Sequence, residues 1–222
     1  MRIAVIVAME KEQRQLQQLF ADNPQVVVTR CGIGKVNAAL GAADVINRCH
    51  PDVVISSGCA GGNGDEVQVK DVVVSTELAY HDVYCGKAID DNTQYGQVQG
   101  MPARYQGDGR LLAIAEQLKG QQTSARIHMG LIVTGDWFVD SKEKMRNIIG
   151  LFPDAKAVDM ESAAIAQTCY KMGVPFVSYR VISDIPLRDT NASQYHDFWD
   201  QVAETSFQTT RHFVEALLEQ GF

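Results

Sequence analysis

Short apolar runs rich in β-branched residues alternate with helix-like segments along the chain, and this alternation restricts the fold more than any other feature. Runs typical of buried strands occupy residues 2–8, 25–30, 51–58, 71–81, 127–136 and 175–184. Helical spacing occupies residues 11–20, 32–50, 107–120, 141–152, 161–173 and 195–220, and the second of these begins with a Gly-rich turn. Strands that alternate with helices predict an α/β fold, in which helices cover both faces of a mostly parallel sheet.

No feature of the sequence divides its 222 residues into separate units. A chain of this length can bury one substantial core, and no Pro/Gly/Ser-rich linker, internal repeat or low-complexity tract interrupts it. We therefore predict one domain over residues 1–222. A loop is expected at 61–66, and the longest irregular stretch is 82–106. Long loops inside compact domains are often functional.

Charge and hydropathy exclude two classes of partner. The net charge is −7 at pH 7, and the sequence has no block of Lys and Arg. We therefore expect the protein to bind neither nucleic acid nor an anionic membrane. The apolar run at 2–8 is too short to cross a bilayer and lacks a small-residue cleavage site, so we interpret it as a core strand and not as a signal peptide.

The five cysteines fit neither a disulfide framework nor a zinc site. Their number is odd, and they form no CxxC motif or Cys/His cluster. Reduced thiols in a cytoplasmic protein without a metal ion are the expectation. The cysteines are Cys31, Cys49, Cys59, Cys85 and Cys169.

Acidic residues follow several of the expected strands. In open α/β sheets, ligands bind beyond the carboxyl ends of the strands. Four such ends are polar or Gly-rich, at residues 8–12, 56–62, 134–138 and 183–184. Glu10 or Glu12 follows the first strand, while Asp136 and Asp184 follow later ones. Glu161 opens a helix, where the helix dipole favours a carboxylate, and it can face the same crevice.

Two Gly-rich segments have different interpretations. The segment GIGKVNAALG (32–41) lacks the GxGxxG spacing, and the chain has no GK[ST] loop, so neither a dinucleotide fingerprint nor a P-loop is predicted. The segment SSGCAGG (56–62) combines three glycines with small side chains after a buried strand. Such backbone can approach a ligand closely. The expected contacts are Cys59, Ala60 and Gly61.

Six short motifs, taken in order, resemble one enzyme family. They are AMEKE, GIGKVNAA, SSGCAGG, GDWF, AVDMESAAIA and RVISD. In this order and spacing they are similar to the 5′-methylthioadenosine/S-adenosylhomocysteine nucleosidases of the nucleoside phosphorylase-like superfamily, most strongly over residues 2–184. The resemblance implies a three-layer αβα sandwich around a mixed, partly barrel-like sheet. It also implies a homodimer that uses no cofactor or metal.

The resemblance further implies a hydrolase that cleaves the N-glycosidic bond of methylthioadenosine and S-adenosylhomocysteine, with 5′-deoxyadenosine as a further candidate substrate. The products are adenine and a thioribose-type sugar, and water is the co-substrate. Asp184 matches the general acid at adenine N7, and Glu12 matches the carboxylate that deprotonates the attacking water. Arg180 and Cys59 match positions near that water.

Five other positions match substrate contacts in this family. Glu161 matches the carboxylate that binds the ribose hydroxyls, and Met160 matches the residue that packs under the sugar. Phe138 matches the ring stacked on adenine, and the backbone of Val139 matches the contact that reads the adenine edge. Ser183 supports the loop that carries the general acid.

The chemistry of N-glycosidic cleavage agrees with these residue types. Cleavage builds positive charge on the ribose and negative charge on the base, so an acid at N7 assists departure of the base. That acid must keep its proton near neutral pH and needs a pKa raised by burial, which the apolar run ending at Asp184 provides. A carboxylate at Glu161 can form charge-assisted hydrogen bonds with two adjacent hydroxyls and stabilise a cationic ring.

Three alternatives remain open from the sequence. A phosphorylase of the same superfamily would need cations for its phosphate, but Ser56 stands where family phosphorylases place an Arg, so hydrolysis is favoured. A hydrolase of futalosine-type nucleosides in the menaquinone pathway is the second. The third, a non-enzymatic nucleoside-binding module, is disfavoured by the acid set of Glu12, Glu161 and Asp184.

Several conspicuous side chains are interpreted as structural. Asp159, His81 and His196 are expected to be structural, and Trp137 is expected to pack or to form a site wall. Without the resemblance, Asp184 at its strand end would be interpreted as a turn or helix cap.

The chain also departs from the family pattern. It has Asp159 where Glu is common and Cys59 where Ser is common. Residues 83–99 form a longer loop, and residues 185–195 differ, so the sequence does not predict the preferred 5′ group.

Overall fold

The computed structural model describes residues 1–222 except for 65, 87–90, 120–124, 189–190, 202–206 and 222. The strands are β1 (Ile3–Val7), β2 (Val26–Arg30), β3 (Val53–Gly62), β4 (Val72–Tyr80), β5 (Tyr105–Gln106), β6 (Ile127–Thr134), β7 (Ala155–Asp159) and β8 (Phe176–Asp184). The helices are α1 (Glu10–Leu19), α2 (Lys35–Cys49), α3 (Gly109–Lys119), α4 (Lys142–Leu151), α5 (Ser162–Met172), α6 (Asn191–Gln201) and α8 (Gln208–Gln220).

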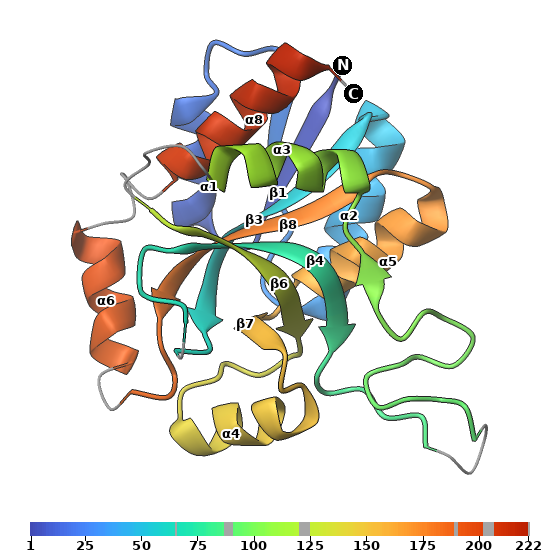
Figure 1. The fold of residues 1–222 in the computed structure, drawn as a ribbon. Coiled ribbons are helices and arrows are strands. Elements are labelled where there is room, and N and C mark those ends of the chain that lie inside the picture. Colours follow the sequence, from blue (N-terminus) through green and yellow to red (C-terminus); the bar gives the residue numbers. More distant parts are fainter. Residues whose placement is uncertain (65, 87–90, 120–124, 189–190, 202–206, 222) are drawn as a thin grey trace.

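The strands form one mixed sheet that closes on itself at one end. Its order is β2-β1-β3-β7-β6-β4-β5, and β8 pairs with both β3 and β4. The pairs β1/β2, β1/β3, β3/β8, β4/β6 and β6/β7 are parallel, whereas β3/β7, β4/β5 and β4/β8 are antiparallel. Because β8 joins β3 to β4, these strands form a closed ring with β6 and β7, and β1 and β2 extend from it as an open sheet (Figure 1).

Helices cover the open part of the sheet on both faces. Side chains of a strand point alternately to its two faces. On β1, Ile3, Val5 and Val7 pack against apolar side chains of α1, α3 and α8, while Ala4 and Ile6 pack against α2 and α5. All five residues are buried, which explains why β1 is a continuous apolar run without alternation. The arrangement is a three-layer αβα sandwich, visible in Figure 1.

Apolar side chains of the described residues pack together inside the ring. One buried cluster fills it, formed with others by Val73, Ile132, Ala157 and Ile182 from four of the ring strands. Helix α4 packs on the outside of the ring through Met145. Among the described residues, no helix is long and apolar enough to cross a membrane.

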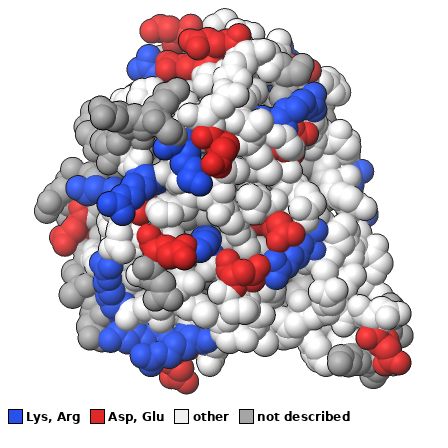
Figure 2. All heavy atoms as spheres, in the orientation of Figure 1, with Lys and Arg blue, Asp and Glu red and all other residues white. Residues whose placement is uncertain are grey.

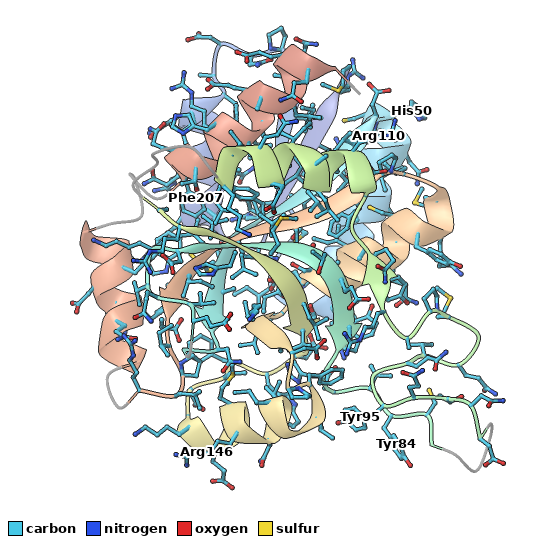
Figure 3. All side chains as sticks on the ribbon, viewed as in Figure 1. His50, Tyr84, Tyr95, Arg110, Arg146 and Phe207 are labelled. Carbon is cyan, nitrogen blue, oxygen red and sulfur yellow. The ribbon has the colours of Figure 1, made fainter. Side chains whose placement is uncertain are left out.

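Two helices have recognisable capping residues, and the irregular stretch expected at 82–106 is confirmed in its described part. Ser141 is the N-cap of α4, and its Oγ accepts a hydrogen bond from the backbone N–H of Lys144 at 3.3 Å. Gly173 ends α5 in the left-handed region at φ 69°. All five cysteines are free. In the described part of residues 82–106 the backbone is irregular until β5 begins, and Tyr84 stacks on Tyr95 at 5.7 Å on the arm that projects from the body (Figure 3).

Other predictions are wrong. A single helix was expected over 195–220, but the structure has α6 and α8, and Phe207 lies in a turn before α8, while 202–206 lie outside the described residues. The strand expected to end at residue 58 continues to Gly62, so the loop expected at 61–66 begins later. Strands β5 and β7 were not predicted because each is short and lacks a β-branched run.

Acidic and basic side chains are mixed over most of the face shown in Figure 2, and several basic side chains adjoin along its lower left edge. Both signs of charge therefore occur on this face of a chain whose net charge is −7.

Candidate active site

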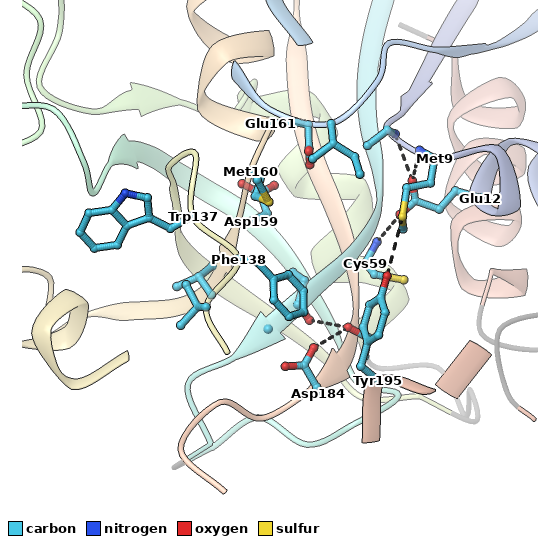
Figure 4. A pocket seen from close by; sticks show the side chains of 17 residues that line it. Met9, Glu12, Cys59, Trp137, Phe138, Asp159, Met160, Glu161, Asp184 and Tyr195 are labelled. Carbon is cyan, nitrogen blue, oxygen red and sulfur yellow. Dashed lines mark hydrogen bonds between the residues drawn. The ribbon is translucent and has the colours of Figure 1, made fainter. Parts of the chain in front are cut away.

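A pocket opens at the carboxyl ends of β1, β3 and β8, where the sequence predicted a ligand site (Figure 4). The β7–α5 turn, residues 137–139 and α6 complete its walls. Ten of the eleven predicted site residues line it: Glu12, Cys59, Ala60, Gly61, Phe138, Val139, Met160, Glu161, Ser183 and Asp184. The eleventh, Arg180, is 1% exposed and contacts the pocket carboxylates from within the protein.

Glu12 is a buried carboxylate held by backbone N–H groups. Its Oε2 accepts hydrogen bonds from Ala8 at 3.0 Å and Met9 at 2.9 Å, and its Oε1 accepts one from Cys59 at 3.0 Å. Burial raises the pKa of Glu12, while Arg180 and the three N–H groups oppose that rise. Its rival from the sequence, Glu10, is more than half exposed and pairs with Arg14 on the surface. The structure therefore brings Glu12, and not Glu10, into the pocket.

Glu161 occupies the junction of β7 and α5. It is the N-cap residue of α5, and its Oε1 accepts a hydrogen bond from the backbone N–H of Gly34 at 3.1 Å. Its Oε2 lies 3.5 Å from Nη2 of Arg180. Burial raises the pKa of Glu161 to about 7, Arg180 opposes the rise, and the nearby carboxylate of Asp159 adds to it.

Asp184 ends β8 and is 5% exposed. The hydroxyl of Ser183 donates a hydrogen bond to its Oδ1 at 2.7 Å. Burial raises the pKa of Asp184 to about 6, and this hydrogen bond opposes the rise only in part. The pocket therefore contains a carboxyl group that keeps its proton closer to neutral pH than an ordinary aspartate does.

Aromatic side chains form the remaining wall. Phe138 and Trp137 are about half exposed, and the ring of Tyr195 from α6 lies edge-on to Phe138 at 5.7 Å between centroids. The hydroxyl of Tyr195 contacts the sulfur of Met9 at 3.7 Å. Within the residues that the structure describes, no cluster of three or more His, Cys, Asp or Glu side chains could hold a metal ion.

Comparison with known proteins identifies the family. The profile described as "Phosphorylase superfamily" matches residues 18–219. An Exiguobacterium protein named 5′-methylthioadenosine/S-adenosylhomocysteine nucleosidase is 38% identical over 237 residues, which cover 99% of this chain and 98% of that protein. A Staphylococcus aureus nucleosidase of the same name is 41% identical over 197 residues, covering 88% of this chain and 82% of the relative. The chain belongs to the 5′-methylthioadenosine/S-adenosylhomocysteine nucleosidase family.

Solved nucleosidases have the same fold. The Neisseria meningitidis nucleosidase in complex with methylthio-immucillin-A superimposes with a TM-score of 0.88 at 36% identity, covering 97% of this chain and 99% of that one. The Colwellia psychrerythraea nucleosidase in complex with adenine superimposes with a TM-score of 0.88 at 32% identity. The match covers 98% of this chain and 96% of that one. The three-layer fold and mixed, partly barrel-like sheet implied by the resemblance are therefore confirmed.

Six residues that line the pocket of this nucleosidase were not predicted as site residues from its sequence: Ala8, Met9, Ile33, Val158, Asp159 and Tyr195. Met9 and Ile33 follow expected strands but are apolar, so no chemical pattern marks them. Tyr195 lies in the segment that departs from the family pattern, and its helical spacing indicated only an amphipathic helix. No local signal in the sequence identifies Tyr195 as a pocket residue.

Three other conspicuous residues, Asp136, His81 and His196, lie outside the lining. Asp136 was expected from its strand end but does not line the pocket, because its Oδ1 accepts a hydrogen bond from the backbone N–H of Lys35 at 2.8 Å at the start of α2. His81 is buried behind Trp137, with ring centroids 5.6 Å apart, and burial lowers its pKa. His196 is exposed on α6. Trp137 lines the pocket as a wall.

Proposed function

We propose that this nucleosidase hydrolyses the N-glycosidic bond of 5′-methylthioadenosine and S-adenosylhomocysteine, releasing adenine and a thioribose-type sugar. The observation that carries the proposal is the set of three buried carboxylates, Glu12, Glu161 and Asp184, around one pocket, each with different hydrogen-bond partners. Different surroundings allow three chemically similar groups to take different protonation states and roles.

Asp184 is the proposed general acid. Its carboxyl group is buried, and its raised pKa favours the protonated form that can donate to N7 of the departing adenine. Phe138 is the proposed stacking surface for the base, and the backbone of Val139 the contact to its edge; both residues line the same wall. Ser183 orients the acid through its hydrogen bond to Oδ1.

Glu12 is the proposed base for the attacking water. Backbone N–H groups take up three of its acceptor positions and favour its ionised form. A carboxylate oxygen accepts at about two positions, so Oε1 keeps one for a water molecule. Cys59 and Arg180 border this carboxylate and are proposed to help confine that water.

Glu161 is the proposed ribose-binding residue. It points into the pocket from the start of α5, and its ionised form can accept hydrogen bonds from two adjacent hydroxyls. Its negative charge also favours the cationic character that the sugar acquires as the base leaves. Met160 beside it offers an apolar surface for the sugar.

Water fits this pocket better than phosphate as the second substrate. Among the described residues that line it, none is Lys or Arg, and Arg180 is already engaged by Asp159 and Glu161. A phosphate dianion would therefore meet acids without a free cation. The deciding experiment measures adenine release with and without phosphate and identifies the sugar product. Free sugar formed at an unchanged rate is expected, and a sugar 1-phosphate with obligatory phosphate dependence would overturn the proposal.

We also propose that the chain is one domain, that it is cytoplasmic, and that it acts as a homodimer. The five free cysteines suit a reducing compartment. The start of α2 presents Val36 and Leu40 at 71% and 65% exposure beside the pocket residue Ile33, and Tyr84 on the neighbouring arm is 66% exposed. Such an apolar surface suits a second copy of the chain around a two-fold axis.

A further inference from the structure

The guanidinium of Arg180 is shared by several buried acids, and the contacts are unequal. Its Nε lies 2.9 Å from Oδ2 of Asp159, whereas its Nη2 lies 3.5 Å from Oε2 of Glu161. Glu12 lies beside another nitrogen of the guanidinium. Oε1 of Glu12 and Nη1 of Arg180 both border the space that a side chain on Gly58 would occupy. Burial acts to lower the pKa of Arg180, but these carboxylates outweigh it and raise the pKa, so the guanidinium stays charged.

Asp159 is itself fixed more firmly than a simple turn cap requires. Its Oδ1 accepts a hydrogen bond from the hydroxyl of Thr134 at 2.6 Å, and both oxygens lie 3.3 Å from the backbone N–H of Ser162. The hydroxyl of Ser162 also donates to its Oδ2. The carboxylate therefore has a single orientation, in which Oδ2 faces the guanidinium.

Serine hydroxyls hold the guanidinium from the side away from the pocket. Ser162 Oγ lies 3.1 Å from Nε, and Ser56 Oγ lies 2.9 Å from Nη2. Ser178 Oγ contacts Ser162 Oγ at 2.7 Å, and all three serines are fully buried. Buried polar groups of this kind keep a charge in one place because they cannot exchange their partners for water.

We propose that Asp159 is a positioning residue that anchors Arg180 between Glu12 and Glu161 and sets how much of its positive charge reaches each of them. This inference rests on the proposed function, because Glu12 and Glu161 are the base and the ribose-binding carboxylate of that reaction. It assigns to Asp159 a role beyond the structural one expected from the sequence.

The direction of the effect follows from the charges. Asp159 competes for the guanidinium and also repels Glu161 directly, and both actions favour the protonated form of Glu161. Removal of the Asp159 charge must therefore lower the pKa of Glu161. The ionisable groups that surround Glu161 are Glu12 from α1, Cys31 after β2, Cys59 from β3, Asp159 from β7 and Arg180 from β8.

The test compares pH profiles of kcat/KM for adenine release in the full-length protein. The acid limb of the profile is the range in which kcat/KM falls as the pH decreases. In Asp159→Asn this limb is expected to move to lower pH by roughly one unit. Asp159→Glu keeps the charge and is expected to keep the wild-type limb. Asp154→Asn is the matched control, because it breaks an exposed Asp–Arg pair with Arg104 away from the pocket, and it is expected to leave the limb unchanged.

Two results would overturn the inference. One is an acid limb of Asp159→Asn at the wild-type position, and the other is an equal shift in Asp159→Asn and Asp159→Glu, because the effect would then come from packing and not from charge. If Asp159→Asn folds but is too slow to assay, ¹³C NMR titration of labelled glutamate carboxyls, with Glu161→Gln for assignment, measures the same shift without turnover. A wild-type protein that releases no adenine would overturn the proposed function, whereas the NMR titration would still decide this inference.

Discussion

A β-carbon on Gly58 would lie 2.5 Å from Oε1 of Glu12, so this carboxylate occupies the space that any other residue at position 58 would need. The same β-carbon would lie 2.8 Å from Nη1 of Arg180, and Gly58 has φ 130°, a conformation that other residues rarely adopt. The glycine in the SSGCAGG segment therefore makes room for protein side chains as well as for a ligand.

Gly58→Ala is predicted to displace Glu12 and Arg180 and to reduce adenine release more than tenfold. Backbone strain and overpacking together are expected to lower the free energy of unfolding by about 2–4 kcal/mol. Gly150→Ala is the control, because a β-carbon there meets nothing within 4 Å in helix α4, and it is expected to be neutral or slightly stabilising. If Gly58→Ala and Gly150→Ala had the same activity and the same thermal unfolding, the close approach of Glu12 and Arg180 to Gly58 would be contradicted.

Asp184→Asn is predicted to bind nucleoside but to lose adenine release by about 10²–10⁴-fold, because the amide cannot supply the proton to N7. Steady-state kinetics together with calorimetric binding of a nucleoside analogue that cannot be cleaved separates the two effects. Asp136→Asn removes an acid from a neighbouring strand end that does not line the pocket, and it should retain most activity. Near-wild-type turnover of Asp184→Asn on methylthioadenosine would refute the assignment of the acid.

The same substitution should change stability in a pH-dependent way. Burial raises the pKa of Asp184 to about 6, above its value in the unfolded chain, so the folded state binds this proton more tightly. The stabilising contribution of Asp184 is therefore complete at pH values below about 4 and is lost as the pH rises through about 6. The stability of Asp184→Asn relative to wild type should rise by about 1–3 kcal/mol across this window. Thermal unfolding of both proteins at a series of pH values measures this change. A stability difference between variant and wild type that stays constant with pH would count against a raised pKa of Asp184.

Glu12→Gln is predicted to stop hydrolysis while permitting substrate binding. The amide keeps the size of the side chain and part of its hydrogen bonding to Ala8, Met9 and Cys59, but it cannot accept a proton from water. Glu10→Gln is the matched control two residues away, on the exposed side of α1, and should remain active. If Glu10→Gln lost adenine release and Glu12→Gln kept it, the wrong carboxylate would have been assigned.

Leu40→Glu is predicted to weaken dimerisation and to reduce activity with it. The side chain is 65% exposed on α2, next to the turn that contributes Ile33 to the pocket, and a charge there would oppose burial against a second copy. Ala113→Glu on the exposed face of α3 is the control for an added charge. Analytical ultracentrifugation at assay concentration gives the mass, and a fully active wild-type monomer would exclude a role for the dimer.

Local patterns sufficed for the layers of the fold and for the acids and the Gly-rich segment of the pocket, whereas Met160, Phe138, Val139 and Ser183 came from the family resemblance. The continuous apolar runs of β1 and β8 mark strands buried on both faces, and the acids at their ends lie where ligands bind in such sheets. The direction of the strands did not follow from these patterns. Antiparallel pairing of β4 with β8 depends on contacts between distant residues such as Val73 and Arg180, and no local spacing records them; the mixed sheet came from the family resemblance.

The sequence also did not show which side chains contact each acid. The sequence indicated only a structural role for Asp159, and the fold brings its carboxylate to within 2.9 Å of Arg180, twenty-one residues later. Tyr195 lies in an ordinary amphipathic pattern, and its place beside Met9 depends on how α6 packs after β8. The position of Asp136 at a strand end predicted that it would lie at the ligand site. This prediction is wrong, because its side chain points to the start of α2 and not to the pocket.

Strand β8 carries Arg180 and Asp184 and has all nine of its residues buried; it pairs with β3 from Phe176 to Asp184 and with β4 from Tyr179 to Val181. A strand in this position exchanges its amide hydrogens only through large-scale opening of the fold, so the arginine and the acid cannot move independently of the sheet. Helix α6 lies outside this strand and contributes Tyr195 to the pocket wall. A library that randomises position 195 and its neighbours on α6, and leaves β8 intact, should yield variants with altered substrate preference and the same chemical step.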